Sequence, residues 1–278
     1  MNEEIKKLYR TAYSLRKDAI DMVYHAKTGH AAPCLSEADI MTTLYFKVMN
    51  LDPKNPHWGD RDRFVLSKGH ASPLYYATLA RRGFFPVEDI FEYRGLNTKL
   101  QGHPDMKKCP GVDFTTGSLG NGLAGALGMA LIGKKDHKNY HVYCICGDGE
   151  LDEGIIWEAA TYAGNAHLGK LIVFVDNNGL QSGGSVEKIQ DLGDIEKRFA
   201  ACKWHTQSID GHDIEAIIHA VDEAKKVEDK PSVIVAHTIK GKGVSYMEGQ
   251  YLWHMKAPND EQYKIAVDEL EKVVKQYE

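Results

Sequence analysis

Two hydrophobic segments, each ending in a short polar group, constrain the fold of this chain more than any other feature. The first, Val142–Cys146, leads into Gly147-Asp148-Gly149, and the second, Leu171–Val175, leads into Asp176-Asn177-Asn178. The residues between them have a helical pattern, so the stretch predicts a strand–helix–strand unit. Because such a unit is right-handed and its strands are parallel, both polar groups reach the same edge of a sheet. We therefore expect Asp148 and Asn178 to lie close together at that edge.

The residue types at this edge suit a cation that is bound together with phosphate. Mg²⁺ prefers oxygen ligands in an octahedron, and a protein usually supplies only some of them. The glycines beside Asp148 let the backbone approach a diphosphate, and the N-terminus of the following helix favours anions. Two other phosphate motifs are absent, because Asp152 stands where G-x-G-x-x-G needs its last glycine and no G-x-x-x-x-G-K-[ST] sequence occurs. Taken alone, Gly-Asp-Gly is equally typical of an ordinary strand–turn–helix connection in which Asp148 caps the helix.

Composition and charge exclude several classes of protein. Of the 278 residues, 43% are hydrophobic and 26% are charged, as in an ordinary soluble globule. The net charge of −5 gives no reason to expect a nucleic acid partner. No apolar stretch approaches a membrane span, and the N-terminal residues lack the apolar region of a signal peptide. Five cysteines without a C-x-x-C motif favour reduced, mostly buried thiols and a cytoplasmic location.

Strand and helix patterns alternate along the chain. We expect strands at 63–67, 142–146, 171–175, 203–209 and 232–237, and helices at 3–27, 36–48, 70–82, 86–94, 117–133, 214–227 and 259–277, besides the helix that joins the two central strands. Residues 95–114 lack periodicity and are typical of a long functional loop. Since no repeat or linker is present, the pattern predicts one α/β domain over residues 1–278, with helices on both faces of a mostly parallel sheet.

Four histidines stand in polar, glycine-flanked loops: His30 in TGH, His70 in LSKGH, His103 in QGHPD and His254 in YLWHMK. A single loop histidine is usually an ordinary surface residue. A zinc site would require closer spacing, such as H-x-x-x-H or nearby cysteines. If they line one cleft, the four could instead donate hydrogen bonds to a developing alkoxide or transfer protons to and from substrate hydroxyls.

The order of these motifs resembles that of the transketolase family. The matching segments are TGH (28–30), LSKGHASPLYYA (66–77), QGHPD (101–105), TTGSLGNGL (115–123), GDG (147–149), NN (177–178), TIKGKG (238–243) and WHMKAPN (253–259). They extend over nearly the whole chain and resemble the N-terminal half of a transketolase, which binds the diphosphate of thiamin diphosphate. The family uses this cofactor and Mg²⁺ to move a two-carbon ketol unit between sugar phosphates.

The resemblance implies roles for particular residues. Asp148, the side chain of Asn178 and the backbone carbonyl of Leu180 would hold Mg²⁺ on the diphosphate. The four loop histidines would contact the diphosphate, the donor hydroxyls or the reaction intermediate. The other residues that it places at the cofactor or at the entrance are Gly117, Ser118 and Leu119 on the aminopyrimidine side, Gly149, Glu153 in a charge network between two active sites, and the basic Lys240 and Lys256.

The resemblance also implies a partner. In the family, the glutamate that activates the aminopyrimidine lies on a second, pyrimidine-binding domain, and no remaining stretch here could form one. We therefore expect a complementary pyrimidine-binding subunit, two copies of each in the assembly, and no activity from this chain alone. The chain departs from the family at His30-Ala31-Ala32, where HPG is frequent, and at Met255, where a glycine is frequent. Both departures bear on the contacts to the donor sugar.

Two alternatives remain open. Another thiamin enzyme, such as a deoxyxylulose-phosphate synthase-like protein or a 2-oxoacid dehydrogenase component, would share the GDG and NN motifs, although QGHPD together with LSKGH argues against both. From a different class, a non-catalytic nucleotide-binding α/β protein would share the fold but would not bind thiamin diphosphate with Mg²⁺. The sugar donor and acceptor are not identified by the sequence.

Overall fold

Five parallel strands form the centre of the computed structural model, which describes residues 1–278. Their order in the sheet is β1-β2-β3-β5-β4, and every neighbouring pair is parallel. The strands are β1 (Arg63–Leu66), β2 (Val142–Gly147), β3 (Leu171–Asn177), β4 (His205–Asp210) and β5 (Ser232–His237). The carboxyl ends of β1, β2, β3 and β5 therefore meet at one edge of the sheet.

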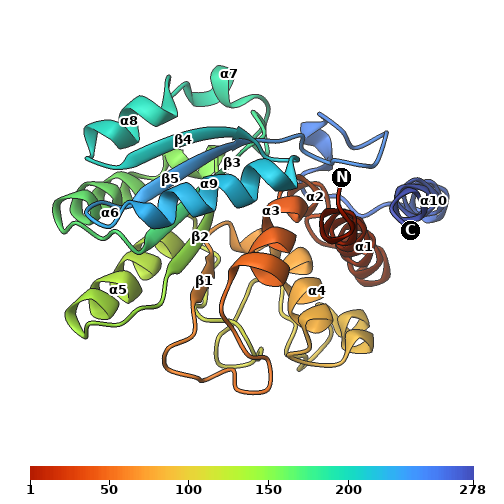
Figure 1. Cartoon of the computed structure of the whole chain (residues 1–278). Helices are drawn as coiled ribbons and strands as arrows, with labels where there is room; N and C mark the ends of the chain where they lie inside the picture. Colours follow the sequence, from red (N-terminus) through yellow and green to blue (C-terminus); the bar gives the residue numbers. More distant parts are fainter.

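Helices cover both faces of this sheet and give three layers (Figure 1). One face carries α1 (Glu3–Ala26), α2 (Ala32–Ser36), α3 (Ala38–Thr43), α4 (Ser72–Arg82) and α9 (Ile214–Lys226). The other face carries α5 (Asn121–Lys135), α6 (Gly154–Asn165) and α8 (Ile195–Ala201), while α10 (Asp260–Gln276) packs against α1. The predicted α/β/α arrangement is confirmed.

The alternation of side chains along the strands explains how one sheet serves two cores. In β2, Tyr143 and Ile145 belong to the larger core beneath α1, α3 and α4, whereas Cys144 and Cys146 belong to the smaller core beneath α5 and α6. A parallel strand that is buried on both faces requires a continuous apolar run, which is what Val142–Cys146 provides. All five cysteines are free, and four of them are buried.

Most predicted elements are present with shifted ends. Pro73 lies in the first turn of α4, as expected, but Gly69–Ala71 before it forms a 3₁₀ turn. The predicted helix at 86–94 is a 3₁₀ segment, Val87–Glu92, and the one at 36–48 divides into α3 and a π-helical turn, Leu44–Val48. The last helix begins as predicted, because Asn259 forms a capping box with Gln262.

Three short helices were not predicted: α2, α7 (Val186–Gln190) and α8. They span five to seven residues, which is too few for a helical period to be read from the sequence. Of the side chains of α7 and α8, only Phe199 is buried. None of the helices combines the length and the hydrophobicity that a membrane crossing requires.

Candidate functional site

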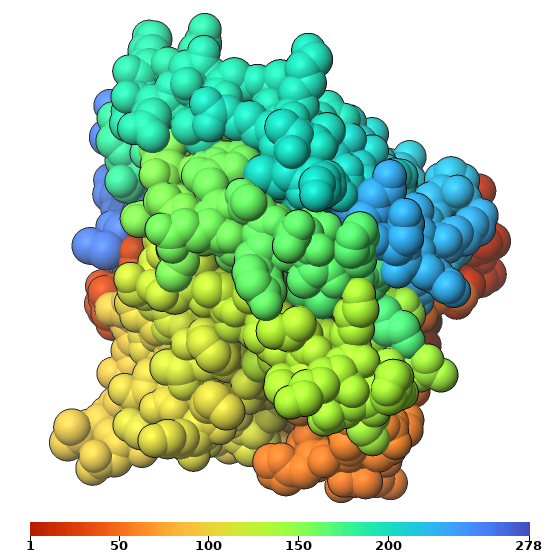
Figure 2. Space-filling model, turned by 90° about the vertical axis from the view of Figure 1, so that its left-hand side faces the viewer, coloured from red at the N-terminus to blue at the C-terminus, as the bar shows by residue number.

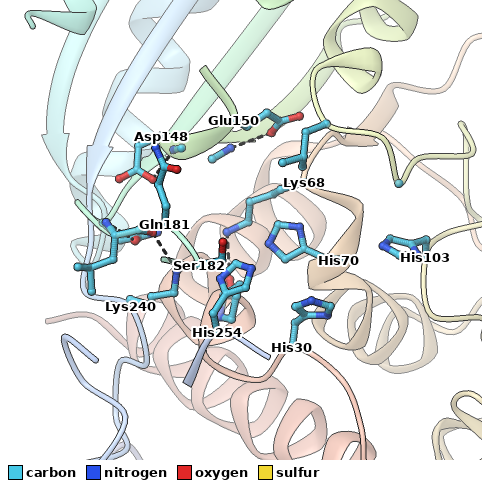
Figure 3. Close-up of a pocket in the computed structure, with 17 residues that line it drawn as sticks. His30, Lys68, His70, His103, Asp148, Glu150, Gln181, Ser182, Lys240 and His254 are labelled. Atoms are coloured by element: carbon cyan, nitrogen blue, oxygen red, sulfur yellow. Dashed lines mark hydrogen bonds between the residues drawn. The ribbon is translucent and has the colours of Figure 1, made fainter. Parts of the chain in front are cut away.

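A cavity of about 260 Å³ lies at the edge of the sheet where β1, β2, β3 and β5 end (Figure 3). Eleven of the residues singled out from the sequence line it: His30, His70, His103, Gly117, Leu119, Asp148, Gly149, Asn178, Leu180, Lys240 and His254. Ser118, Glu153 and Lys256 do not line it, and all three are exposed. The cavity also contains residues that the sequence did not single out, among them Lys68, Glu150 and Gln181.

Asp148 lies between the carboxyl ends of β2 and β3. Its backbone N–H donates to the carbonyl of Asp176 at 3.2 Å, which joins the two strand ends. Its carboxylate accepts hydrogen bonds from the backbone N–H groups of Gly149, at 2.7 Å, and Gly179, at 2.5 Å. Burial and the nearby carboxylate of Asp176 raise the pKa of Asp148 to about 6. A buried carboxylate of this kind is stabilised by a cation.

Asn178 and Leu180 bring two more oxygen atoms to the same cavity. The Asn178 amide donates from Nδ2 to Asp176 at 3.2 Å, and its Oδ1 accepts from the backbone N–H of Leu180 at 3.1 Å. The carbonyl of Leu180 accepts from the ammonium of Lys240 at 2.9 Å, so a cation already lies on this oxygen. The donor set of one carboxylate, one amide and one carbonyl fits the oxygen preference of Mg²⁺. No group of three or more His, Cys, Asp or Glu arranged for a metal is present, and this donor set does not need one.

Lys68 and Asp176 form a buried ion pair beneath these ligands. Asp176 also accepts from the hydroxyls of Ser36, at 2.6 Å, and Thr238. Burial alone would raise the pKa of the Asp176 carboxyl, but Lys68 together with the hydroxyls of Ser36 and Thr238 holds it below its usual value. Asp176 is therefore a fixed negative charge that orients the amide of Asn178. The signals in the sequence were the lysine inside LSKGH and the aspartate directly before NN.

Glu150 connects three segments that surround the cavity. Its carboxylate accepts from the Ser67 hydroxyl and from the backbone N–H groups of Gly120, at 2.7 Å, and Gly147, at 3.0 Å. It thereby joins the end of β1, the start of α5 and the end of β2. Burial raises the pKa of Glu150. Its position directly after GDG was the only indication of this role in the sequence.

Three of the four histidines form a cluster (Figure 3). The ring centroids of His30, His70 and His254 lie 5.0 to 5.3 Å apart. Burial lowers the pKa of His30 to about 4 and that of His254 to about 3, and it places the pKa of His70 well below its ordinary value. The Nδ1 atoms of His30 and His254 are buried without a hydrogen-bond partner. The cluster is uncharged at neutral pH, so it can accept or donate protons at a substrate.

Two glycines keep the cavity open. A Cβ atom on Gly117 would lie 3.4 Å from the ring of His103, and one on Gly149 would lie 2.6 Å from Cγ of Gln181. A side chain at Gly149 would therefore displace Gln181, and one at Gly117 would extend into the cavity beside His103. Lys240 is also buried here, and burial and Lys68 lower its pKa to about 8. The cavity combines glycine-lined walls, the buried cations of Lys68 and Lys240, and carboxylate, amide and carbonyl oxygen atoms, which suit a diphosphate bound with a divalent cation.

The fold and the site together define a thiamin diphosphate-binding domain. Residues 8–270 match the family described as "Transketolase, thiamine diphosphate binding domain". The chain belongs to this transketolase family, and the resemblance seen in its motifs is confirmed.

Two relatives match this chain over nearly their whole length. A 6-deoxy-6-sulfo-D-fructose transketolase subunit, SqwG, from Clostridium sp. (strain MSTE9) is 44% identical over 98% of this chain and 99% of its own. An apulose-4-phosphate transketolase subunit from Phocaeicola vulgatus is 38% identical over 95% of this chain and 93% of its own.

Longer transketolases match over part of their length. The crystal structure of transketolase from Campylobacter jejuni superposes with a TM-score of 0.91 at 35% identity, covering 100% of this chain and 46% of that one. Human transketolase is 40% identical over 91% of this chain and 40% of its own. The chain thus spans less than half of these two transketolases and nearly all of the two shorter relatives.

Proposed function

We propose that this chain is the thiamin diphosphate-binding subunit of a two-subunit transketolase. With a complementary pyrimidine-binding subunit, it transfers a two-carbon ketol unit between sugar phosphates. The observation that carries the proposal is the position of the oxygen atoms of Asp148, Asn178 and Leu180 beside the uncharged histidines in one cavity. The end-to-end match to relatives named as transketolase subunits supports the same conclusion.

The strand ends would hold the metal and the diphosphate. Asp148, Oδ1 of Asn178 and the carbonyl of Leu180 would bind Mg²⁺. The residues that would contact the cofactor itself are His70, His254, Lys240 and Gly149 at the diphosphate, and Gly117 and Leu119 at the aminopyrimidine. Once bound, thiamin diphosphate supplies a nucleophilic carbon, C2 of its thiazolium ring.

The histidines would act on the sugar hydroxyls. Because the imidazoles of His30 and His103 have lowered pKa values, both are available to accept a hydroxyl proton or to donate a hydrogen bond at neutral pH. His103 lies apart from the other three in Figure 3, on the loop that precedes Gly117. This separation gives the cavity two groups of imidazoles that can contact different hydroxyls of one extended substrate.

A partner subunit would cover surfaces that are exposed in this chain. Ser118, which the family resemblance places on the aminopyrimidine side, and Glu153, which it places in a charge network between two active sites, are both exposed. Ile132 on α5 and Tyr162 on α6 are 52% and 51% exposed, and the segments that carry them lie on the surface seen in Figure 2. Exposed apolar side chains of this size favour an interface. We propose an assembly of two copies of each subunit.

The test is to assay ketol transfer by the purified chain with Mg²⁺ and thiamin diphosphate, with and without the complementary subunit. We expect transfer only from the mixture, and we expect calorimetry to show Mg²⁺-dependent cofactor binding. The two shorter relatives are named for different sugars, so the donor panel includes 6-deoxy-6-sulfo-D-fructose and sugar phosphates. Absence of cofactor binding in the mixture would contradict the proposal and would favour a non-catalytic protein.

A further inference from the structure

Three of the cavity histidines directly follow a glycine, and the dipeptide Tyr93-Arg94 contacts two of these glycines, Gly29 and Gly102. A Cβ atom on Gly29, which precedes His30, would lie 3.2 Å from Cε1 of Tyr93. A Cβ atom on Gly102, which precedes His103, would lie 3.0 Å from Nη2 of Arg94. Val23 and the Tyr93 ring therefore occupy the space that a side chain at Gly29 would need, and the Arg94 guanidinium occupies the space at Gly102. This gives both glycines a packing role beside the histidines.

Arg94 also forms hydrogen bonds that connect the two histidine loops. Its Nε donates to the Tyr93 hydroxyl at 3.1 Å, and its Nη1 donates to the hydroxyl of Thr28 at 3.3 Å, two residues before His30. Its backbone N–H donates to the carbonyl of Leu100 at 2.9 Å, three residues before His103. The planar guanidinium thus lies between the loop of His30 and the loop of His103.

The opposite side of the His103 loop is held by α4. The Tyr76 hydroxyl donates to the carbonyl of His103 at 2.9 Å, and the Ser72 hydroxyl donates to that of Gly102 at 2.9 Å. The loop is therefore fixed between α4 on one side and Arg94 on the other. The two hydrogen bonds from α4 reach the His103 loop and not the His30 loop, whereas Arg94 contacts both loops. The position of Arg94 therefore affects where His103 lies relative to His30.

Arg94 is the one permanent cation that acts on both histidines. After burial, it is the largest influence that lowers the pKa of His30, followed by His103 and Lys240, and His70 and His254 also face this ring. After burial, Arg94 is likewise the influence that lowers the pKa of His103. A positive charge beside an imidazole disfavours its protonated form.

We propose that Tyr93 and Arg94 are positioning residues that fix His30 and His103 relative to one another and place one permanent positive charge beside both imidazoles. Tyr93 packs on Gly29 and so limits how close the His30 loop can approach. Arg94 joins the His30 loop to the His103 loop and contributes the positive charge beside both imidazoles. The importance of this device for catalysis rests on the proposed function, because an uncharged imidazole is needed to accept a proton from a sugar hydroxyl. The geometry itself does not depend on that function.

The first test is an NMR titration of the histidines in the full chain, without partner or substrate. Difference spectra of His30→Asn and His103→Asn assign the two signals. Arg94→Met removes the charge and the planar fork, and Arg63→Met at the start of β1, on the opposite edge of the sheet, is the matched control. We expect the titration midpoints of His30 and His103 to rise in Arg94→Met and to remain at their wild-type values in Arg63→Met. Unchanged midpoints in Arg94→Met would overturn the proposal.

Gly102→Ala gives an independent route to the same result. It leaves Arg94 in the chain but forces the guanidinium away, since the new Cβ atom would lie 3.0 Å from it. We expect the His103 midpoint to rise in this variant as well. Arg94→Lys keeps a positive charge but lacks the planar guanidinium, so the titration midpoints of His30 and His103 should return to their wild-type values. A Lys variant with midpoints as high as those of Arg94→Met would exclude the charge as the cause.

The second test uses the chain together with its complementary subunit. Arg94→Met should lower kcat/KM for ketol transfer about 10²-fold, because displaced catalytic groups cost rate on this scale. Thiamin diphosphate affinity should not change, since Arg94 does not line the cavity. A loss of cofactor affinity in a folded Arg94→Met variant would place Arg94 at the diphosphate and overturn the proposal. If no variant or wild type transfers a ketol unit, the proposed function fails, while the NMR titration still decides the role of Arg94.

Discussion

Asp148 is a residue whose surroundings raise the pKa of its carboxyl group, and a bound cation would offset this effect. Its carboxylate is 3% exposed and faces Asp176, and it is held by two backbone N–H groups. The same burial that disfavours the free carboxylate strengthens its interaction with a dication, because water does not screen the charges. The residue is therefore suited to a site that binds metal and diphosphate together.

Replacing Asp148 by Ala should abolish cofactor binding. The change removes the only carboxylate among the three proposed ligands, which should cost several kcal/mol of binding free energy. Calorimetric titration of thiamin diphosphate and Mg²⁺, with the complementary subunit present, measures this loss. Asp136→Ala, which removes an exposed carboxylate at the end of α5 that does not line the cavity, is the control. Equal affinity in wild type and Asp148→Ala would exclude Asp148 as a ligand.

Glu37 gives a prediction about pH and stability. It is fully buried, and neither carboxylate oxygen forms a hydrogen bond, although Oε2 lies 3.3 Å from the ammonium of Lys68. Burial raises its pKa to about 8, against the opposing effect of Lys68. The folded chain therefore holds this proton more tightly than the unfolded chain does. The contribution of Glu37 to stability is therefore complete below the unfolded pKa and is lost as the pH rises from about 4.5 to about 8.

The Glu37→Gln variant should remove this decline. A glutamine has nothing to deprotonate, so between pH 5 and pH 8 the variant should lose less free energy of unfolding than wild type, by an amount on the order of a few kcal/mol. Thermal unfolding of the cofactor-free chain across this pH range measures the difference. Parallel pH profiles for wild type and Glu37→Gln would show that Glu37 is ionised in the folded chain.

At the scale of elements, the segment that follows β5 is fixed by helices from the other end of the chain. His212, directly before α9, accepts a hydrogen bond at Nε2 from the backbone N–H of Ile239 at 2.9 Å. Its Nδ1 lies 2.8 Å from Asp39 on α3, and Asp39 binds the guanidinium of Arg16 on α1. Three helices thus determine the position of Ile239 and of the adjacent Lys240.

His212→Ala should loosen this segment without unfolding the sheet. We expect faster hydrogen exchange over residues 238–243 and about tenfold weaker binding of thiamin diphosphate, as when one supporting hydrogen bond is lost at a metal or phosphate site. His219→Ala on the exposed side of α9 is the control, because its imidazole is 77% exposed. Exchange rates over 238–243 that match the control would show that His212 does not hold the segment.

Particular residues show how much the sequence could predict. Val142–Cys146 and Leu171–Val175 identified the parallel sheet, because strands buried on both faces must be apolar throughout. The GDG and NN motifs located the carboxyl-end edge of the sheet, and the family resemblance supplied the histidines. Glu150 and Arg94 could not be assigned in this way, since their roles depend on partners far away in the chain, such as Gly120 for Glu150 and Thr28 for Arg94. Such contacts appear only when the strands and loops are assembled.

At the scale of the whole molecule, the exposed apolar side chains form two pairs, one on the outer helices and one beside the cavity at the edge of the sheet. Ile132 and Tyr162 lie on the outer sides of α5 and α6, and Leu252 and Met255, on either side of His254, are 68% and 67% exposed. A subunit that completes the active site would have to cover Leu252 and Met255. Ile132 and Tyr162 would be covered by the same subunit or by a second copy of this chain.

Tyr162→Glu should weaken the assembly while leaving the fold of the chain intact. The side chain is half exposed, so the change introduces a charge at an interface without disturbing a core. Light scattering of the chain mixed with its complementary subunit should show a smaller mass for the variant at equal concentration. Phe91→Glu, at a half-exposed aromatic position on another part of the surface, is the control. Equal masses for the mixtures that contain wild type, Tyr162→Glu and Phe91→Glu would exclude Tyr162 from the interface.

The buried carboxylate of Asp148 has a consequence for the lifetime of this protein in a cell. Burial and the nearby Asp176 raise the free energy of this carboxylate in the folded chain when no metal is bound beside it. A ligand that binds only the folded state stabilises it in proportion to the logarithm of ligand concentration, and proteases remove the unfolded fraction. The abundance of the protein should therefore follow the supply of vitamin B1, with degradation outpacing synthesis when the vitamin is scarce.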